Sequence, residues 1–429
     1  RGRGQMSIIK DYVEYVYGKP NAKKCTLCNS ELIEPLLNFI GDNPKSYLIG
    51  TKESVEFTKE YQENPEKMFQ PIMNKMERKI VHIIGTGTIG EPLIGILCEQ
   101  KSNLGIDEIT FHKHSPLTKD KPKIDNLIKK GARLSVLEDR IDSFKAIGLE
   151  PEFTLEEAIA RSSVVIDCTP GGSGLLNKEK YYNKYTDKVK GFLAQGSENG
   201  FGKKYARGIN DHVINSEDQF LQIVSCNTHN IACLVNTLGL SIAPDNLIAG
   251  KFVCIRRSND ISQASGYVPA PTVNVHNHQD YGTHHAEDAV GLFNTMNLDL
   301  DLFSSALKIN TQYMHTVWFN LKVKEPTSKE KVVELLNHND RIALTEHRAS
   351  NAVFSFGRDQ GQYGRILNQT VVVEDSINVK GEHEISGFCF TPQDGNSILS
   401  SIAATVKFLN PHSYQDKIAS LNPFFFQRI

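Results

Sequence analysis

A cysteine stands between a strand pattern and a helix pattern in the middle of the chain. Residues 221–224 have the pattern of a strand and residues 231–238 that of an apolar helix, with Ser225-Cys226-Asn-Thr-His-Asn230 between them. Cys226 is therefore expected at or just before a helix N-terminus, where the helix dipole and unpaired N–H groups stabilise a thiolate. Such a thiolate can attack a carbonyl carbon while nearby amides hold the oxyanion. The alternative is a buried structural cysteine, which is the commoner case.

Histidines are frequent in the second half of the chain, and a thiolate nucleophile usually needs a base. They are His276, His278, His284, His285, His315, His338, His347 and His383. Spacing alone does not select one of them. The cluster at 276–285 also suggests a metal site, but no cysteine or dense carboxylate set accompanies it, so we expect no metal there.

A glycine-rich turn follows the first buried-strand pattern, residues 79–84. Gly85-Thr-Gly87-Thr-Ile-Gly90 matches G-x-G-x-x-G and leads into an apolar helix pattern at 93–98. Gly85 permits a tight turn, Gly87 lets the backbone approach a pyrophosphate, and Gly90 lets helix and strand pack closely. The motif predicts a dinucleotide site; the alternative is a glycine-rich turn that binds no ligand.

The second strand pattern, residues 108–111, lacks the acidic residue that holds the adenosine ribose of NAD in such sites. His112-Lys-His-Ser-Pro116 stands there instead. The Lys113 cation tolerates a 2′-phosphate, so NADP is allowed beside NAD, unless Lys113 is only a solvated surface residue. A second glycine-rich turn, Cys168-Thr-Pro-Gly-Gly-Ser-Gly174, follows a strand pattern ending at Asp167 and favours a nucleotide site, although a simple loop explains it too.

The arrangement of these motifs predicts two sheets. Helix and strand patterns alternate from residue 79 to 224, which indicates βαβ units on a parallel sheet. Longer strand patterns then follow at 251–257, 311–323, 341–344, 369–373 and 384–390, and a last helix pattern at 396–408. We predict an α/β protein with a Rossmann-type parallel-sheet domain and an α+β catalytic domain whose large sheet is mainly antiparallel, with helices on one side.

The expected domains are an N-terminal extension, a dinucleotide-binding domain, a catalytic domain and a C-terminal segment whose helix returns to the dinucleotide-binding domain: 1–78, 79–225, 226–392 and 393–429. In the extension, Cys25 and Cys28 supply at most two of the four ligands of a structural zinc site. The alternative is a helical appendage that packs on the rest of the chain or contributes to assembly.

Composition excludes several function classes. The 429 residues include 48 Lys and Arg against 50 Asp and Glu, a net charge of −2, which argues against general nucleic-acid binding. No apolar stretch approaches the roughly 18–20 residues that span a bilayer. Eight scattered cysteines do not form a disulfide framework and indicate a reducing compartment, so we expect a cytoplasmic protein.

From about Lys79 to the C-terminus, the sequence resembles the archaeal-type (class II) glyceraldehyde-3-phosphate dehydrogenases. The matching stretches keep the family's order and spacing: Gly85-Thr-Gly-Thr-Ile-Gly90, Lys113-His-Ser-Pro116, Asp167-Cys-Thr-Pro-Gly-Gly-Ser-Gly174, Gln195-Gly-Ser197, Val224-Ser-Cys-Asn-Thr228, Ile255-Arg-Arg257, Thr283-His-His-Ala-Glu-Asp288, Met314-His315 and Glu374-Asp-Ser-Ile-Asn-Val379.

The resemblance implies roles for individual residues. Cys226 would be the nucleophile and His315 the general base and acid. Positions that hold the aldehyde and phosphate groups of the substrate match Ser225, Asn227, His284 and His285. Cofactor contacts, besides the glycines of the turn, match Thr88, Ile89, Lys113, Ser197, Arg257 and Gln393.

The implied reaction converts glyceraldehyde 3-phosphate, NAD or NADP, and inorganic phosphate to 1,3-bisphosphoglycerate through a cysteine thioester, in a homo-oligomer that the resemblance suggests is a tetramer. Alternatives are a non-phosphorylating enzyme, a dehydrogenase of a related phospho-aldehyde, and a binding or assembly protein without activity. The sequence departs from the family in the extension, at His229 and Ser197, and across 265–281, which bears on substrate preference and phosphate affinity.

Overall fold

The computed structural model describes residues 78–196, 198–215, 217–260, 263, 265–392 and 394–429. The chain divides into two units, Arg1–Arg78 and Lys79–Ile429, and the second contains both sheets. The expectations for the N-terminal extension, including Cys25 and Cys28, lie outside the described residues.

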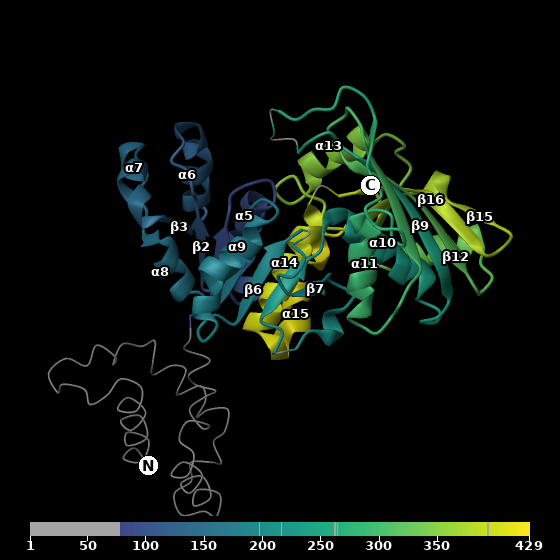
Figure 1. Cartoon of the computed structure of the whole chain (residues 1–429), viewed down its shortest axis with the longest axis horizontal. Coiled ribbons are helices and arrows are strands. Elements are labelled where there is room, and N and C mark those ends of the chain that lie inside the picture. The colour runs from purple at the N-terminus through teal and green to yellow at the C-terminus, as the bar shows by residue number, and fades with distance from the viewer. Residues whose placement is uncertain (1–77, 197, 216, 261–262, 264, 393) are drawn as a thin grey trace, which may run out of the picture. The chain divides into compact units, whose positions relative to one another are not determined.

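The first sheet is entirely parallel and has the strand order β4-β3-β2-β1-β5-β6-β8-β7 (Figure 1). Its strands are β1 Ile80–Ile84, β2 Glu108–His112, β3 Ala132–Val136, β4 Phe153–Thr154, β5 Val164–Asp167, β6 Gly191–Gln195, β7 Lys203–Tyr205 and β8 Phe220–Ile223. All five residues of β1 are buried, as expected of a strand with helices on both faces. The strand order reverses between β1 and β5, and the carboxyl ends of strands at such a point are where ligands bind.

Helices from both ends of the described chain cover this sheet. They are α5 Gly90–Leu104, α6 Lys121–Lys129, α7 Ile141–Ala146, α8 Leu155–Ala160, α9 Ser173–Lys180, α14 Gly395–Leu409 and α15 Tyr414–Ala419. The long helix α14, yellow in Figure 1, contacts α5, β5 and β6, although it lies more than 190 residues after them. Its Ile398 and Ile402 share one hydrophobic core with Leu93 of α5, so the end of the chain is part of the first sheet's core.

The second sheet is mixed, with the order β10-β11-β9-β12-β16-β14-β13 and with β15 paired to β16. Its strands are β9 Leu247–Arg256, β10 Thr272–Val273, β11 Leu302–Lys308, β12 His315–Val323, β13 Ile342–Thr345, β14 Thr370–Val373, β15 Asn378–Lys380 and β16 Glu384–Thr391. The pairs β9–β11 and β13–β14 are parallel and the other pairs are antiparallel. The predicted fold class is confirmed.

Three helices lie on one face of the second sheet. Alternate residues of β12 are buried, and Val317, Phe319 and Leu321 share a core with α10 Cys226–Leu234, α11 His284–Asn294 and α12 Lys329–Asn337. A further helix, α13 Ser350–Gln360, packs on the opposite face, because Val371 and Val373 share a small core with its Val353 while Val372 belongs to the core of the first three helices. The expectation of helices on one side only is therefore wrong for α13. The helix layer matters for function because it brings the N-termini of α10 and α11 to the sheet.

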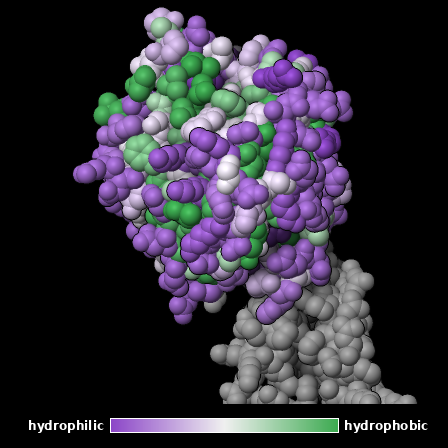
Figure 2. Space-filling view, turned by 90° about the vertical axis from the view of Figure 1, so that its right-hand side faces the viewer, coloured by the Kyte–Doolittle hydropathy of each residue, from purple (hydrophilic) through white to green (hydrophobic). Residues whose placement is uncertain are grey.

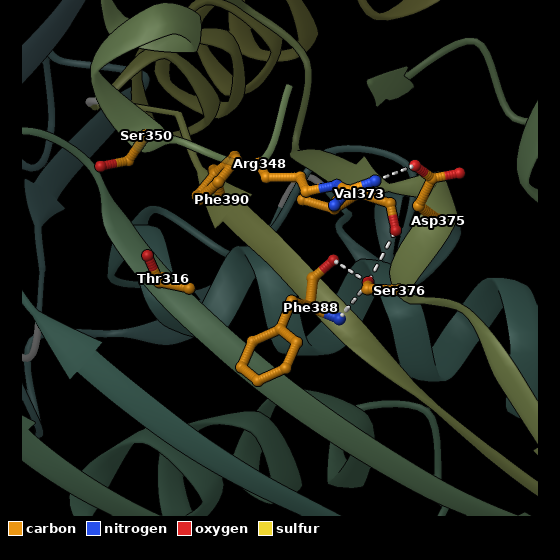
Figure 3. A pocket seen from close by; sticks show the side chains of 8 residues that line it. All are labelled: Thr316, Arg348, Ser350, Val373, Asp375, Ser376, Phe388 and Phe390. Atoms are coloured by element: carbon orange, nitrogen blue, oxygen red, sulfur yellow. Dashed lines mark hydrogen bonds and ion pairs between the residues drawn. The ribbon is translucent and has the colours of Figure 1, made fainter. Parts of the chain in front are cut away.

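The opposite face of the second sheet is partly open. A hollow of about 510 Å³ there is lined by residues of β12, β14 and β16, among them Thr316 and Phe388 (Figure 3). Phe388 is 41% exposed. Figure 2 shows hydrophobic groups in separate patches between hydrophilic ones on the side of the molecule that carries β15 and β16.

The described part of the chain was compared with two requirements, those of a membrane-spanning helix and of a disulfide. None of its helices is both long enough and apolar enough to cross a membrane. Its cysteines, Cys98, Cys168, Cys226, Cys233, Cys254 and Cys389, are all free.

The glycine turn after β1 has the predicted backbone geometry. Gly85 has a φ of +101°, a conformation that L-residues rarely adopt. A Cβ atom at Gly90 would overlap the carbonyl oxygen of Gly85, whereas a Cβ atom at Gly87 would have no heavy atom within 4 Å. Gly90 therefore serves packing, and Gly87 leaves open space in front of the turn.

These environments make opposite predictions for two alanine variants. Gly90→Ala should lower the free energy of unfolding by about 1–3 kcal/mol, because the backbone of the turn must move to admit the methyl group. Gly87→Ala, the matched control, should change it by less than about 0.5 kcal/mol. Urea unfolding of both variants measures this, and equal losses of stability would contradict the assigned packing.

Candidate active site

Cys226 is the first residue of α10, at the place the sequence indicates. The helix begins five residues before the apolar pattern because Ser225 caps it, its hydroxyl accepting the Thr228 N–H at 3.4 Å. The Cys226 carbonyl accepts a hydrogen bond from the Asn396 side chain at 2.9 Å. The start of α10 is thus held by its own cap and by α14.

The surroundings of Cys226 favour the protonated thiol over the thiolate. The residue is partly exposed, yet burial of its thiol and the nearby carboxylate of Asp394 together raise its pKa to about 12. The Arg257 and Arg256 guanidinium groups and the Asn227 N–H lower the pKa but do not balance the loss of solvation. The direction of this shift is opposite to the one that a resting thiolate requires.

His315 is the first residue of β12 and lies in the same region. It pairs with Thr391 of β16, whose hydroxyl donates to the Asn227 side chain next to Cys226 at 3.0 Å. Its Nδ1 accepts the backbone N–H of Arg257 at 3.0 Å. Burial, with Arg257, Arg256 and His285 nearby, holds the pKa of His315 well below its usual value. The neutral ring then carries its proton on Nε2, so a second proton can be taken up only at Nδ1, after release of the Arg257 N–H.

His284 and His285 begin α11 after Thr283. Their ring centroids lie 3.9 Å apart. Burial lowers the pKa of both, and the nearby Asp288 carboxylate partly offsets this for His284. His285 is 3% exposed, and neither of its ring nitrogens has a hydrogen-bond partner among the described residues. Buried polar atoms are normally satisfied, so this ring fits a ligand contact.

Arg257 directly follows β9, and its guanidinium is 4% exposed. Its Nη2 lies 2.5 Å from Asp260 and 3.7 Å from Asp394, while Nε and Nη1 have no hydrogen-bond partner in the described part of the chain. Asp394 has a φ of +57°, and burial raises the pKa of its carboxyl. Arg257 therefore offers buried donors beside Cys226.

The glycine turn is tied to these residues. Asp260, the ion-pair partner of Arg257, accepts a hydrogen bond from the Thr88 hydroxyl at 3.3 Å. Arg365, in the segment after α13, donates to the Thr88 carbonyl at 3.1 Å. Ile89 directly precedes α5. The structure thus brings Thr88 and Arg257, both expected cofactor contacts, to one place that also adjoins Cys226.

Backbone N–H groups at the second glycine-rich turn already have an acceptor within the protein. The buried carboxylate of Glu198 accepts the N–H groups of Gly172 and Leu175 at the start of α9. The helix N-terminus is therefore neutralised by a carboxylate of the protein itself.

His229, where the sequence departs from the family, is a structural residue. It is fully buried, its Nδ1 lies 3.0 Å from the Ser225 carbonyl oxygen, and its Nε2 lies 2.7 Å from the Ser400 hydroxyl of α14. Burial lowers its pKa to about 4. This histidine fixes the start of α10 from behind and leaves neither ring nitrogen for a ligand.

The remaining expected contacts have different positions. Lys113 follows β2, and its ammonium lies 2.6 Å from the Asp120 carboxylate. Ser197 and Gln393 lie outside the described residues. Within the described ranges, no group of three or more His, Cys, Asp or Glu side chains is arranged to hold a metal ion.

Sequence reasoning missed several charged residues of the site. Asp260, Asp394 and Arg365 stand in separate loops, and no local pattern links them to Cys226. Arg256 could have been found from the sequence, because it directly precedes Arg257 in a matched motif. Its charge lowers the pKa of both Cys226 and His315.

Comparison with known proteins gives a consistent result. No protein-family model matches the chain. A glyceraldehyde-3-phosphate dehydrogenase of Sulfolobus acidocaldarius is 26% identical over 80% of this chain and 95% of the relative. Those of Methanopyrus kandleri and Pyrobaculum islandicum are 28% and 23% identical, each over 70% of this chain and over 83% and 84% of the relative. The chain is similar to the archaeal glyceraldehyde-3-phosphate dehydrogenases. This similarity agrees with the resemblance of the separate motifs.

The charges around Cys226 predict its reactivity. Asp394→Asn removes the nearby negative charge, and asparagine tolerates the left-handed backbone at this position. The thiol pKa should fall, so alkylation of Cys226 by iodoacetamide at pH 8 should be about tenfold faster. Peptide mapping by mass spectrometry measures the rate at Cys226 as a function of pH.

The control is Asp375→Asn, whose carboxylate pairs with Arg348 beside the hollow of Figure 3. It should leave the alkylation rate unchanged. An Asp394→Asn rate equal to that of the unmodified chain would show that Asp394 does not control the thiol.

Proposed function

We propose that this chain is an NAD(P)-dependent dehydrogenase that oxidises glyceraldehyde 3-phosphate through a thioester on Cys226. The observation that carries the proposal is the connection between two motifs. Arg257 acts on the Cys226 thiol, and its partner Asp260 binds Thr88 of the glycine turn. A nucleophile and a dinucleotide-binding turn in one site are what such an oxidation requires. The names of the similar archaeal proteins support the substrate.

The residues present fit a dinucleotide. Gly87 leaves open space in front of the turn, and the buried Arg257 has donors without a partner among the described residues. Gly85 to Gly90, Lys113 and Arg257 would hold the cofactor, with Ser197 and Gln393 as further expected contacts. A bound nicotinamide supplies the hydride acceptor.

Residues of the chain attack the aldehyde carbon and transfer the protons of the reaction. The Cys226 sulfur adds to the aldehyde carbon while the thiol proton passes to the carbonyl oxygen, which gives a hemithioacetal. Arg256 and Arg257 favour negative charge on sulfur during the attack. His315 donates to the substrate oxygen through Nε2. To take up the hydroxyl proton, its ring must release the Arg257 N–H and turn so that the unprotonated Nδ1 faces the substrate.

The residues expected to bind the rest of the substrate lie at the N-termini of α10 and α11. Ser225 and Asn227 flank the nucleophile, and Thr391 orients the Asn227 amide. His284 and His285 would contact the phosphorylated aldehyde, because His285 has buried ring nitrogens without a described partner. Inorganic phosphate then attacks the thioester carbon, which releases 1,3-bisphosphoglycerate and restores the thiol. A homotetramer in the cytoplasm stays a prediction from sequence.

The direct test is an assay of nicotinamide reduction with glyceraldehyde 3-phosphate, with and without inorganic phosphate. Cys226→Ser should lower kcat by about a thousandfold or more, because serine is a far weaker nucleophile without an activated base. Binding of the dinucleotide should persist. The matched control is Cys233→Ala, seven residues later in the same helix and buried, which should keep most of the activity.

Near-normal activity of Cys226→Ser would overturn the nucleophile assignment. A rate that does not depend on phosphate would identify a non-phosphorylating enzyme. Dinucleotide binding without reduction of any phosphorylated aldehyde would identify a binding protein.

A further inference from the structure

The ion pair between Lys113 and Asp120 stands where the adenosine end of a dinucleotide is expected. Lys113 directly follows β2, and its backbone N–H donates to Ser135 of β3 at 3.1 Å. Its Nζ lies 2.6 Å from the Asp120 Oδ2, and both side chains are mostly buried, at 16% and 22% exposure. In a parallel sheet of this topology, the ribose lies at the carboxyl end of the second strand.

Asp120 reaches this place through the start of α6. It ends the short 3-10 turn Thr118–Asp120 and directly precedes Lys121 of α6. Two residues further, the Lys123 ammonium donates to the Thr86 carbonyl in the glycine turn at 3.3 Å and lies 2.9 Å from Glu91. The first turn of α6 is thus attached to the glycine turn, and Asp120 lies on the side of the expected cofactor.

The ion pair supplies a carboxylate, which is the group that the end of β2 lacks for binding the ribose of NAD. The hydrogen bond from Lys113, with the charges of Lys113, Lys123 and Lys119, lowers the pKa of Asp120, so the carboxylate is ionised at neutral pH. A ribose 2′-OH can donate to that carboxylate. A 2′-phosphate instead brings two negative charges against it and must compete with it for Lys113.

Resting on the proposed function, we propose that Asp120 is a specificity-determining residue that disfavours the 2′-phosphate of NADP and so favours NAD. Lys113 alone would attract the phosphate. In the ion pair, the Asp120 carboxylate neutralises the charge of Lys113. The same carboxylate can accept a hydrogen bond from the ribose 2′-OH.

The test compares NAD and NADP on the full chain carrying Asp120→Asn. Dissociation constants from calorimetry and kcat/KM with glyceraldehyde 3-phosphate are measured for both dinucleotides. The ratio of NADP to NAD affinity should rise about tenfold, mainly through tighter NADP binding, because one negative charge beside the phosphate is removed. Adding Lys113→Met to Asp120→Asn should cancel the gain.

The matched control is Asp125→Asn, on the same helix, whose carboxylate pairs with Lys121 in an exposed ion pair. It should leave the ratio unchanged. An unchanged or lowered ratio in Asp120→Asn, with both dinucleotides still binding, overturns this inference and leaves the proposed function intact. If neither dinucleotide binds the unmodified chain, both fail. Asp120→Ser provides a second variant should the asparagine variant fold poorly.

Discussion

Removal of the Cys226 thiol from water is the constraint on which the rest of the site depends. A sulfur at a helix N-terminus has favourable dipoles, but here burial raises its pKa to about 12. Two arginines lower the pKa and one aspartate raises it, so the ionisation state depends on charges contributed by β9, the segment after it and the start of α14. Chemistry at this sulfur therefore requires a change in those charges or transfer of its proton during the attack.

Those charges are held by contacts between the two sheets. Asp260 joins Arg257 to Thr88, and Arg365 holds the carbonyl of the same threonine. Helix α14 returns to the first sheet and also binds the start of α10, through Asn396 to the Cys226 carbonyl and Ser400 to His229. Polar contacts from the segment after β9 thus reach the glycine turn, and polar contacts from α14 hold the start of α10 at Cys226.

Local patterns were sufficient for much of the fold. The β-branched run at β1, the glycine turn and the strand-to-helix junction at Cys226 each carry their signal within about ten residues. Boundaries were less well predicted. The pattern at 311–323 becomes a strand only from His315, and the helix at 231 begins at Cys226, because a capping hydroxyl and the pairing with β9 and β16 decide where an element starts.

The sequence by itself determined which residues can do chemistry: Cys226, the histidines, and the glycines whose backbone freedom the turn uses. Only the tertiary structure decided their protonation and their partners. Glu198 accepts the N–H groups of the second glycine-rich turn, Asp394 raises the pKa of Cys226, and Asp120 places a carboxylate beside Lys113. Propensity and capping act over a few residues along the chain, whereas desolvation and charge pairing act through space between segments that no local pattern connects.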